Sequence, residues 1–438
     1  MTAEGIAKDA SSAFSVLKTL SDSQRSGALN KIYDSLKKNK EQILERNQID
    51  MDNAKSNNLS TSLIKRLDLS NPGKFDTMLQ GILDVAKLED PVGKVSLQRK
   101  LDEGLNLYRV SSPIGVLLII FESRPEVIAN ITALAIKSGN CAILKGGKES
   151  YETFKIMSDI VNRTLQDETE VPSSAIQLIQ TREDVNDLLS QDKYIDLVIP
   201  RGSNELVRNI KSNTKIPVLG HADGICSIYV DEEADLTKAS RIIVDSKTNY
   251  PAGCNAVEQL LIHHSINQES IVKIIKSLIE AKVNVHVEPQ VKQMIENEPE
   301  IDLQYVFDTI DDSFDKEYLS FDISVKFVES VEDAIKHINI HSSKHTESII
   351  TENKDTANKF LKAIDSAGVY WNCSTRFADG FRYGFGTEVG ISTNKIHARG
   401  PVGLEGLMTY QYQLKGDGHI VGDYVGGGGK KLFVHEDI

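Results

Sequence analysis

The chain has 438 residues and a formal net charge of −13, which argues against nucleic acid or an anionic membrane as the main partner. Its 40% hydrophobic and 26% charged residues are typical of a globular protein with two or three domains and ample core. The longest apolar run, 114–121, is too short to span a bilayer, no signal peptide is visible, and four cysteines form neither a disulfide framework nor a metal-ligand spacing, so we expect a cytoplasmic protein without a metal.

The first ninety residues are predicted to be mainly helical. Their polar–apolar periodicity predicts helices over 10–20, 23–38, 40–56 and 74–88. Between residues 95 and 110 the pattern changes to two alternating runs around Asp102-Glu103-Gly104, which predicts a β-hairpin.

Strands and helices then alternate from residue 114 to 230, and Gly139 marks the end of one helix. This alternation is typical of an α/β fold, in which helices cover a parallel sheet that often binds nucleotides. The predicted strands are 114–121, 141–145, 175–178, 195–199, 216–219 and 225–230. The predicted helices between them are 125–138, 149–165, 184–189 and 204–211.

Cys254 is the candidate nucleophile. Pro251 and Gly253 interrupt regular structure around it, and the apolar run 257–263 predicts a buried strand that holds the turn. A thiol on a supported turn suits nucleophilic attack, because the sulfur is exposed in one orientation. The alternative is a structural role, since free cysteine packs as a small hydrophobe. Cys373, which also lies in a predicted loop, is the rival nucleophile.

Two glycine-containing segments have part of the pattern of a phosphate-binding loop. The tetraglycine 426–429 precedes Lys430, but no Ser or Thr follows and no strand–loop–helix surrounds it, so we predict a flexible tail. Gly202 and Ser203 follow a predicted strand and open a helix, where backbone amides would favour a pyrophosphate. The alternative is that Ser203 serves only as a helix N-cap.

Several short motifs occur in a fixed order along the chain. They are FESRP (121–125), KSGN (137–140), ILKGG (143–147), PRGS (200–203), LGHADG (219–224), the Cys254 loop, the segment 334–347 and the block 372–401. Together they resemble the aldehyde dehydrogenase superfamily, and within it most closely the γ-glutamyl phosphate reductases. The resemblance extends over nearly the whole chain.

The resemblance implies an activity, namely NADPH-dependent reduction of L-glutamate 5-phosphate to L-glutamate 5-semialdehyde in proline biosynthesis. In that reaction Cys254 would attack the acyl carbonyl, expel phosphate and form a thioester, for which a thiolate is well suited. A homo-oligomer is implied, and a glutamate 5-kinase that supplies the acyl phosphate is a candidate partner.

Two positions depart from the wider superfamily. Val218 stands where oxidising aldehyde dehydrogenases carry the glutamate that activates water, and this loss suits a reductase. The oxyanion-hole asparagine of the superfamily would fall near Glu122 or Ser123, so no side chain is assigned beyond the backbone amide of Cys254.

The expected cofactor residues are carried over from the resemblance. Lys145 matches the lysine at the adenosine ribose, Gly202 and Ser203 match the pyrophosphate helix, and Glu317 matches the glutamate at the nicotinamide ribose. Lys148 occupies a position where members that prefer NAD often carry a glutamate, and its ammonium would attract a 2′-phosphate. The alternative for Lys148 is a solvated residue at the start of a helix.

The expected substrate residues are arginines, because the guanidinium suits both carboxylate and phosphate. Arg376 and Arg382 lie in a glycine-rich loop near the substrate end implied by the resemblance, and Arg124 is the third candidate. Either loop arginine could instead brace the loop by pairing with Asp379 or Glu388.

The implied fold has three parts. Residues 1–90 and 113–240 would form an NADP-binding domain, 241–395 a catalytic domain, and 91–112 with 396–438 a small β-flap for oligomerisation. Two other functions stay open, a CoA-acylating aldehyde dehydrogenase and a non-catalytic protein that keeps the fold.

Overall fold

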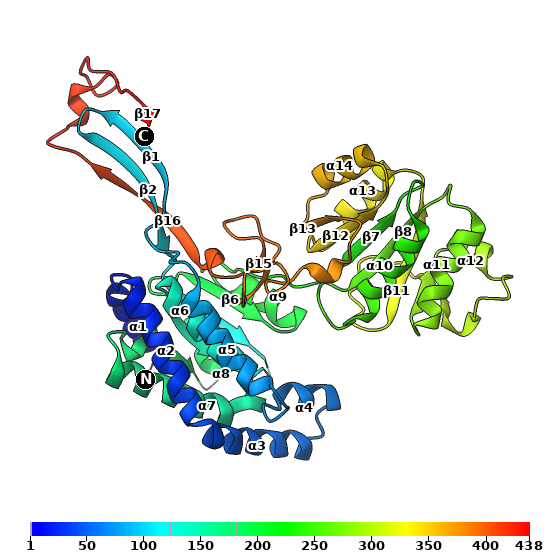
Figure 1. Cartoon of the computed structure of the whole chain (residues 1–438), viewed down its shortest axis with the longest axis horizontal. Coiled ribbons are helices and arrows are strands. Elements are labelled where there is room, and N and C mark those ends of the chain that lie inside the picture. Colours follow the sequence, from blue (N-terminus) through cyan, green and yellow to red (C-terminus); the bar gives the residue numbers. More distant parts are fainter. Residues whose placement is uncertain (1, 123, 180–181) are drawn as a thin grey trace. The chain divides into compact units, whose positions relative to one another are not determined.

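The computed structural model describes residues 2–122, 124–179 and 182–438, and the chain divides into two compact units (Figure 1). Unit 1 comprises Met1–Leu219, Phe385–Gly390 and Val402–Ile438, and unit 2 comprises Gly220–Gly384 and Ile391–Pro401. The chain thus enters unit 2 at Gly220, whereas the sequence placed a boundary near residue 240. The reason is that the strand following Gly220 pairs with strands of the second unit.

Unit 1 begins with a layer of helices whose ends follow the sequence signals. Ser21 and Gln24 form a capping box at the start of α2, and Gly139, with φ 77°, ends α6 as predicted. The helix α4 was not predicted. The helices of unit 1 are α1 (Ala3–Leu17), α2 (Asp22–Lys38), α3 (Lys40–Ser56), α4 (Thr61–Leu67), α5 (Lys74–Lys87), α6 (Val127–Ser138), α7 (Tyr151–Glu168), α8 (Arg182–Leu188) and α9 (Asn204–Asn213).

The helices of unit 1 accompany a parallel sheet with the strand order β5-β4-β3-β6, which confirms the predicted α/β architecture. All residues of β3 are buried, as expected for a central strand covered on both faces. The predicted strand 216–219 is reduced to a single bridge between Val218 and Val198. The strands are β3 (Val116–Phe121), β4 (Cys141–Lys145), β5 (Ile176–Ile179) and β6 (Leu197–Arg201).

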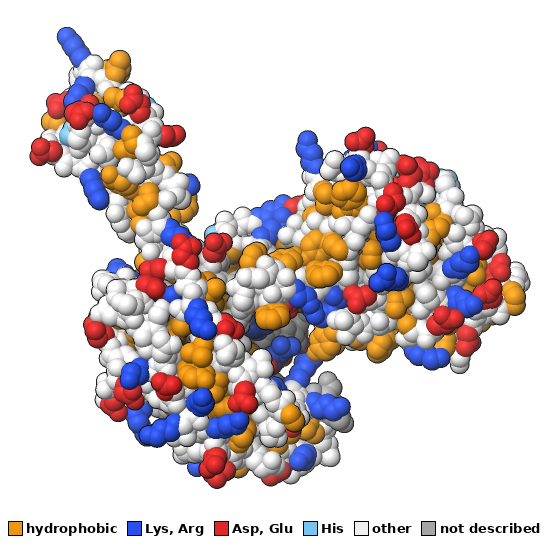
Figure 2. Space-filling model, in the orientation of Figure 1, with side chains coloured by type: hydrophobic (Ala, Val, Ile, Leu, Met, Phe, Trp, Pro, Cys, Tyr) orange, Lys and Arg blue, Asp and Glu red, His pale blue; other side chains and the backbone are white. Residues whose placement is uncertain are grey.

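A second, antiparallel sheet of unit 1, called the arm here, joins the predicted hairpin to the C-terminal segment. Its order is β16-β2-β1-β17, so the C-terminal strands flank the hairpin as expected (Figure 1). Figure 2 shows apolar side chains among the charged groups of the arm, and Tyr410, Tyr412 and Leu414 of β16 are each more than half exposed. The strands are β1 (Val95–Asp102), β2 (Leu105–Pro113), β16 (Met408–Lys415) and β17 (Glu436–Asp437).

The tetraglycine 426–429 forms a closed turn, in contrast to the predicted flexible tail. Tyr424 and Lys431 form a β-bridge on either side of it. The Tyr424 hydroxyl donates to the Asp102 carboxylate at 2.7 Å, and Lys431 forms an ion pair with the same group. These two contacts hold the pKa of Asp102 well below its usual range. The turn is therefore anchored to the hairpin.

Unit 2 contains a parallel sheet with the order β10-β9-β11-β8-β7-β12-β13 among the described residues. Alternate residues of its strands face opposite layers: Leu260 packs toward α10, α11 and α12, and Leu261 packs toward α13 and α14. The strands are β7 (Cys226–Val230), β8 (Val257–His263), β9 (Asn284–Val287), β10 (Val306–Asp308), β11 (Asp322–Val328), β12 (Thr346–Ile350) and β13 (Gly368–Trp371). The helices are α10 (Leu236–Thr248), α11 (Gln268–Glu280), α12 (Pro289–Ile295), α13 (Val331–His341) and α14 (Lys354–Ala363).

Two further short strands, β14 (Gly390–Ser392) and β15 (Gly400–Val402), pair with each other. Across the described ranges, no helix combines the length and the apolar character needed to cross a membrane.

Candidate active site

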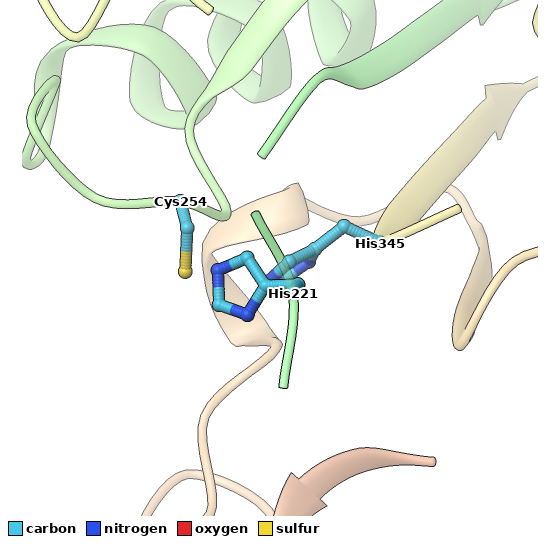
Figure 3. Close-up of side chains that lie close together, drawn as sticks. All are labelled: His221, Cys254 and His345. Carbon is cyan, nitrogen blue, oxygen red and sulfur yellow. The ribbon is translucent and has the colours of Figure 1, made fainter. Parts of the chain in front are cut away.

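Cys254, His221 and His345 come together because each lies just before a strand of the unit 2 sheet. Cys254 is on the turn before β8, His221 on the segment before β7, and His345 directly before β12. These strands are neighbours in the order β8-β7-β12 and run parallel, so all three begin at the same edge of the sheet. Neighbouring strands in a sheet are about 4.8 Å apart. The sulfur and one nitrogen of each ring lie within 4.8 Å of one another (Figure 3).

Both imidazoles are oriented through their Nδ1 atoms. His221 Nδ1 is 3.0 Å from the Ile391 carbonyl oxygen, which can only accept, so Nδ1 carries the proton. His345 Nδ1 is 2.8 Å from the Thr346 hydroxyl. His345 is 1% exposed, and its Nε2 has no hydrogen-bond partner among the described residues. A buried polar atom left in this state costs about 1–3 kcal/mol, which is typical of a site built for a ligand or a proton.

The turn that carries Cys254 is braced by a segment distant in sequence. The Thr375 hydroxyl donates to the Asn255 carbonyl oxygen at 2.7 Å, and the Asn255 amide donates to the Ala378 carbonyl oxygen at 2.9 Å. The Cys254 carbonyl oxygen accepts from the Cys226 thiol at 3.3 Å. Burial raises the pKa of Cys226 well above its usual value, so that thiol stays a donor. The predicted supported turn is confirmed.

Gly224 packs directly against the turn, which leaves no room for a side chain. A methyl carbon placed there would lie 2.6 Å from the Cys254 Cα and 2.6 Å from Glu317 Oε1. Both distances are far below ordinary van der Waals contact. The carboxylate of Glu317 therefore lies next to the turn of Cys254, although the sequence pattern alone indicates a surface charge.

Arg376 is the candidate substrate residue that lies beside the turn. Its guanidinium lies 5.6 Å from the centroid of the Tyr250 ring, and its Nη1 lies 2.7 Å from where a Gly253 side chain would begin. Arg382 donates to the Arg376 carbonyl oxygen at 2.5 Å and is exposed. Burial and the neighbouring Arg382 lower the pKa of Arg376. Arg124 belongs to unit 1, where it is exposed ahead of α6.

Of the two expected adenosine residues, Lys148 lines a pocket in unit 1 and Lys145 does not. Lys145 ends β4, and the exposed Lys148 stands at the entry to α7. The pocket has a volume of about 270 Å³ and is lined by Asp50, Asn53, Gly146, Gly147, Lys148, Tyr151, Glu152, Phe154, Leu178 and Ile179. Glu152 pairs with Arg46 at 3.3 Å, and Asp50 accepts from the first amides of α7. The two acids thus have partners within the protein.

Gly202 and Ser203 begin α9 as the sequence predicts. The Ser203 hydroxyl accepts from the Leu206 amide at 3.5 Å, so Ser203 caps the helix, and its role toward a pyrophosphate stays a prediction. A side chain at Gly202 would meet the carboxyl carbon of Glu122 at 2.8 Å. Ser123, the other position considered for the oxyanion hole, lies outside the described residues.

Cys373 has a different environment. It helps line a groove of about 840 Å³ on unit 2, with Lys238, Ser240, Arg241, Ile242, Val244, Asp245, Thr248, Ser277, Asn372, Ser374 and Phe377. Burial raises the pKa of its thiol, which lowers the thiolate fraction that nucleophilic attack requires.

Sequence reasoning did not select His221 or His345, although both lie in motifs that support the resemblance. His345 immediately precedes the buried strand β12 and His221 lies five residues before β7, so the approach to a buried strand is a usable signal. Residues 221, 254 and 345 are far apart in the chain, and only the strand order brings them together.

Comparison with known proteins agrees with this arrangement. The family model described as "Aldehyde dehydrogenase family" matches residues 1–302. The chain belongs to this family. Gamma-glutamyl phosphate reductase of Saccharomyces cerevisiae is 59% identical over 449 residues, which cover 100% of this chain and 98% of that protein. At this identity and coverage, the chain is placed among the γ-glutamyl phosphate reductases.

Solved structures give the same assignment for the fold. The crystal structure of gamma-glutamyl phosphate reductase from Thermotoga maritima has a TM-score of 0.91 and 38% identity, covering 96% of this chain and 100% of that one. An acetylating aldehyde dehydrogenase from Geobacillus thermoglucosidasius has a TM-score of 0.65 at 17% identity, covering 95% and 97%. This second likeness concerns the fold alone.

Proposed function

We propose that the protein reduces L-glutamate 5-phosphate to L-glutamate 5-semialdehyde with NADPH, through a thioester on Cys254, as a step of proline biosynthesis. The observation that carries the proposal is the braced turn of Cys254, with two imidazoles and a guanidinium beside it. Relatives of full length that are named gamma-glutamyl phosphate reductase support the same reaction.

The two imidazoles give the thiol a proton acceptor. With Nδ1 of His221 held by a carbonyl oxygen, its Nε2 bears the lone pair in the neutral ring. The imidazole takes the proton of Cys254, the thiolate attacks the acyl carbonyl, and the same proton then passes to the departing phosphate oxygen. The ring returns to its neutral form, so charge and protons balance in this half of the reaction.

The substrate carries both a phosphate and a carboxylate, and Arg376 lies where it can bind one of them. Its pKa is lowered first by burial and then by Arg382, so part of the guanidinium is withdrawn from water and next to a second cation. An anionic substrate offsets both effects through charge-assisted hydrogen bonds. Arg124 and Arg382 stay candidates for the second anionic group.

A nicotinamide cofactor belongs to this family of enzymes and supplies the hydride that reduces the thioester carbonyl. The pocket of unit 1, which Gly146, Gly147 and Lys148 help line, is the place we propose for its adenosine end. We assign Lys145, Gly202, Ser203 and Glu317 the roles that the resemblance implies. Lys148 favours NADPH, because an ammonium attracts the 2′-phosphate while a glutamate would repel it.

The arm supports association into a homo-oligomer. Strand β16 lies at the edge of the arm sheet, and within the described chain it pairs only with β2. Tyr410, Tyr412 and Leu414 on this strand are 56%, 60% and 57% exposed. An exposed edge with apolar side chains is a template for pairing with another chain, and the occupant we propose is a second copy of this protein.

The main alternative is a CoA-acylating aldehyde dehydrogenase. The acetylating enzyme shares the fold at 17% identity, whereas the reductase relative is 59% identical over the full chain. Transfer of the acyl phosphate from a glutamate 5-kinase and a cytoplasmic location stay predictions.

The test is the reverse reaction, in which the protein reduces NADP⁺ with glutamate 5-semialdehyde and inorganic phosphate. We expect Cys254→Ala to abolish turnover in both directions and Cys373→Ala to keep most of it, with both variants folded by circular dichroism. Equal losses in the two variants would remove the assignment of the nucleophile. Faster turnover with acyl-CoA than with acyl phosphate would favour the alternative enzyme.

A further inference from the structure

We infer that Cys254, His221 and His345 form a binding site for Zn²⁺, which blocks the nucleophile reversibly. The sulfur and one nitrogen of each ring already lie within 4.8 Å of one another. A thiolate and two imidazoles are a ligand set that Zn²⁺ prefers among the common cellular divalent ions. The sequence spacing shows no metal motif, because the three ligands come from separate strand starts.

The geometry needs only small side-chain movements. Zinc binds sulfur at about 2.3 Å and nitrogen at about 2.0–2.1 Å, so tetrahedral ligands stand roughly 3.3–3.6 Å apart. The present separations of up to 4.8 Å therefore contract by at most about 1.2–1.5 Å. Cys254 and His221 are only half-buried and can make this movement, while His345 is fixed in the core. Three protein ligands leave a fourth position for water.

The environment of His345 is the independent observation that points to a ligand. Its Nε2 is buried and has no hydrogen-bond partner among the described residues, in a ring that is 1% exposed. Both rings are also held at Nδ1, by the Ile391 carbonyl oxygen and the Thr346 hydroxyl. Metal-binding histidines are usually oriented in this way through the nitrogen that does not bind the metal. The close-up in Figure 3 shows the three side chains converging.

The charged groups near the site have opposite effects on the binding of a cation. Arg376, next to Gly253, disfavours a cation, and Glu317, next to Gly224, favours one. The Cys254 thiolate neutralises one further charge of the ion. Once coordinated, the sulfur lone pair is no longer available to attack a carbonyl, so bound zinc inhibits the enzyme and competes with alkylation of the thiol.

The first experiment measures metal binding without substrate or cofactor. The wild-type protein is titrated with Zn²⁺ against a chromophoric chelator, and with Co²⁺ to record thiolate-to-metal charge-transfer absorption. We expect one ion per chain and the charge-transfer band, which Cys254→Ser removes. His345→Ala and His221→Ala should weaken Zn²⁺ at least tenfold, while His264→Ala, a change at an exposed histidine, should leave the affinity unchanged. Wild-type affinity in His345→Ala, or no charge-transfer band, would overturn the inference.

The second experiment needs no variant. Zn²⁺ should slow the alkylation of Cys254 by iodoacetamide at least tenfold, and EDTA should restore the rate, as read by mass spectrometry of the peptide. Cys373 provides the internal control, because its alkylation should not change. An unchanged rate at Cys254 in the presence of Zn²⁺ would contradict the site even if every histidine variant failed to fold.

Discussion

Substitution of Gly224 by alanine tests whether the catalytic turn depends on the close approach of the preceding segment. The new methyl carbon would start 2.6 Å from the Cys254 Cα and 2.6 Å from Glu317 Oε1. Ordinary carbon contacts begin at about 3.5 Å, so the turn or the segment must move by about 1 Å. A displacement of this size costs about a hundredfold in catalysis, which corresponds to roughly 2.7 kcal/mol in the barrier. The overpacking itself costs about 1–3 kcal/mol of stability.

The assay compares kcat/KM for the phosphate-dependent reverse reaction with the melting temperature and the circular dichroism spectrum. The matched control is Gly27→Ala in α2, where an added methyl group meets no atom within 4 Å. That control should keep wild-type kcat/KM and gain about 0.5–1 kcal/mol of stability, because alanine replaces glycine inside a helix. A folded Gly224→Ala protein with wild-type kcat/KM would refute the reasoning.

Four further predictions concern cofactor, substrate, thioester and stability. Lys148→Glu should reverse or erase a preference for NADPH, because it removes a charge-assisted contact with the 2′-phosphate that contributes roughly 1.5–3 kcal/mol, or ten- to a hundredfold in affinity. Comparable kcat/KM for NADPH and NADH in the wild type would contradict this prediction. Arg376→Ala should lower kcat/KM for L-glutamate 5-phosphate by a similar factor while the KM for NADPH stays constant; a change confined to NADPH would remove Arg376 from the substrate site. Because Val218 replaces a water-activating glutamate, oxidation of the semialdehyde should require inorganic phosphate, and steady oxidation in buffer free of phosphate and arsenate would show hydrolysis instead. Burial raises the pKa of Glu347 to about 8, so the folded state keeps a proton that the unfolded chain loses near pH 4.5, and stability falls as the pH rises toward 8. Glu347→Gln should flatten this fall in melting temperature, and identical slopes for both proteins would disprove the assignment.

The sequence predicted the elements of the α/β units well wherever local chemistry determines them. Gly139 ends α6 with φ 77°, and β3 was recognised from its continuous apolar run. The prediction of a strand over 216–219 was wrong, because a strand also needs a neighbour with which to pair. Only the bridge between Val218 and Val198 forms there. The helix α4 has only seven residues, so its periodicity gives little signal.

Some residues of the motifs that support the resemblance belong to the candidate site, and others maintain the fold. Lys137 is buried and donates to the Asp22 carboxylate at 2.6 Å and to the Ala86 carbonyl oxygen at 3.1 Å, so it joins three helices. Asn140 accepts from the Gly115 amide at 2.8 Å and donates to the Leu407 carbonyl oxygen at 2.9 Å. These motif residues maintain the fold, and a sequence match alone does not separate them from the residues of the active site.

The candidate site was predicted only in part, for a related reason. Cys254 was identifiable because its turn and the following strand are adjacent in sequence. The two histidines contribute through the order β8-β7-β12, which no local pattern encodes. Likewise, the proximity of Glu317 to the turn depends on Gly224, whose lack of a side chain has meaning only in the folded protein.

Three acid–base groups of the unit 2 sheet are kept from water, which bears on how long a thioester on Cys254 would last. Glu258 on β8 is fully buried and forms an ion pair with the equally buried Lys247 at 2.6 Å. Glu347 on β12 is buried beneath hydroxyl and amide donors, and its raised pKa keeps it protonated through neutral pH. His345 presents its Nε2 from a ring that is 1% exposed. A base must reach a water molecule to hydrolyse a thioester, and burial denies water to each of these three groups. His221 beside Cys254 is only half-buried, so the phosphate requirement of the oxidation tests whether this imidazole activates water.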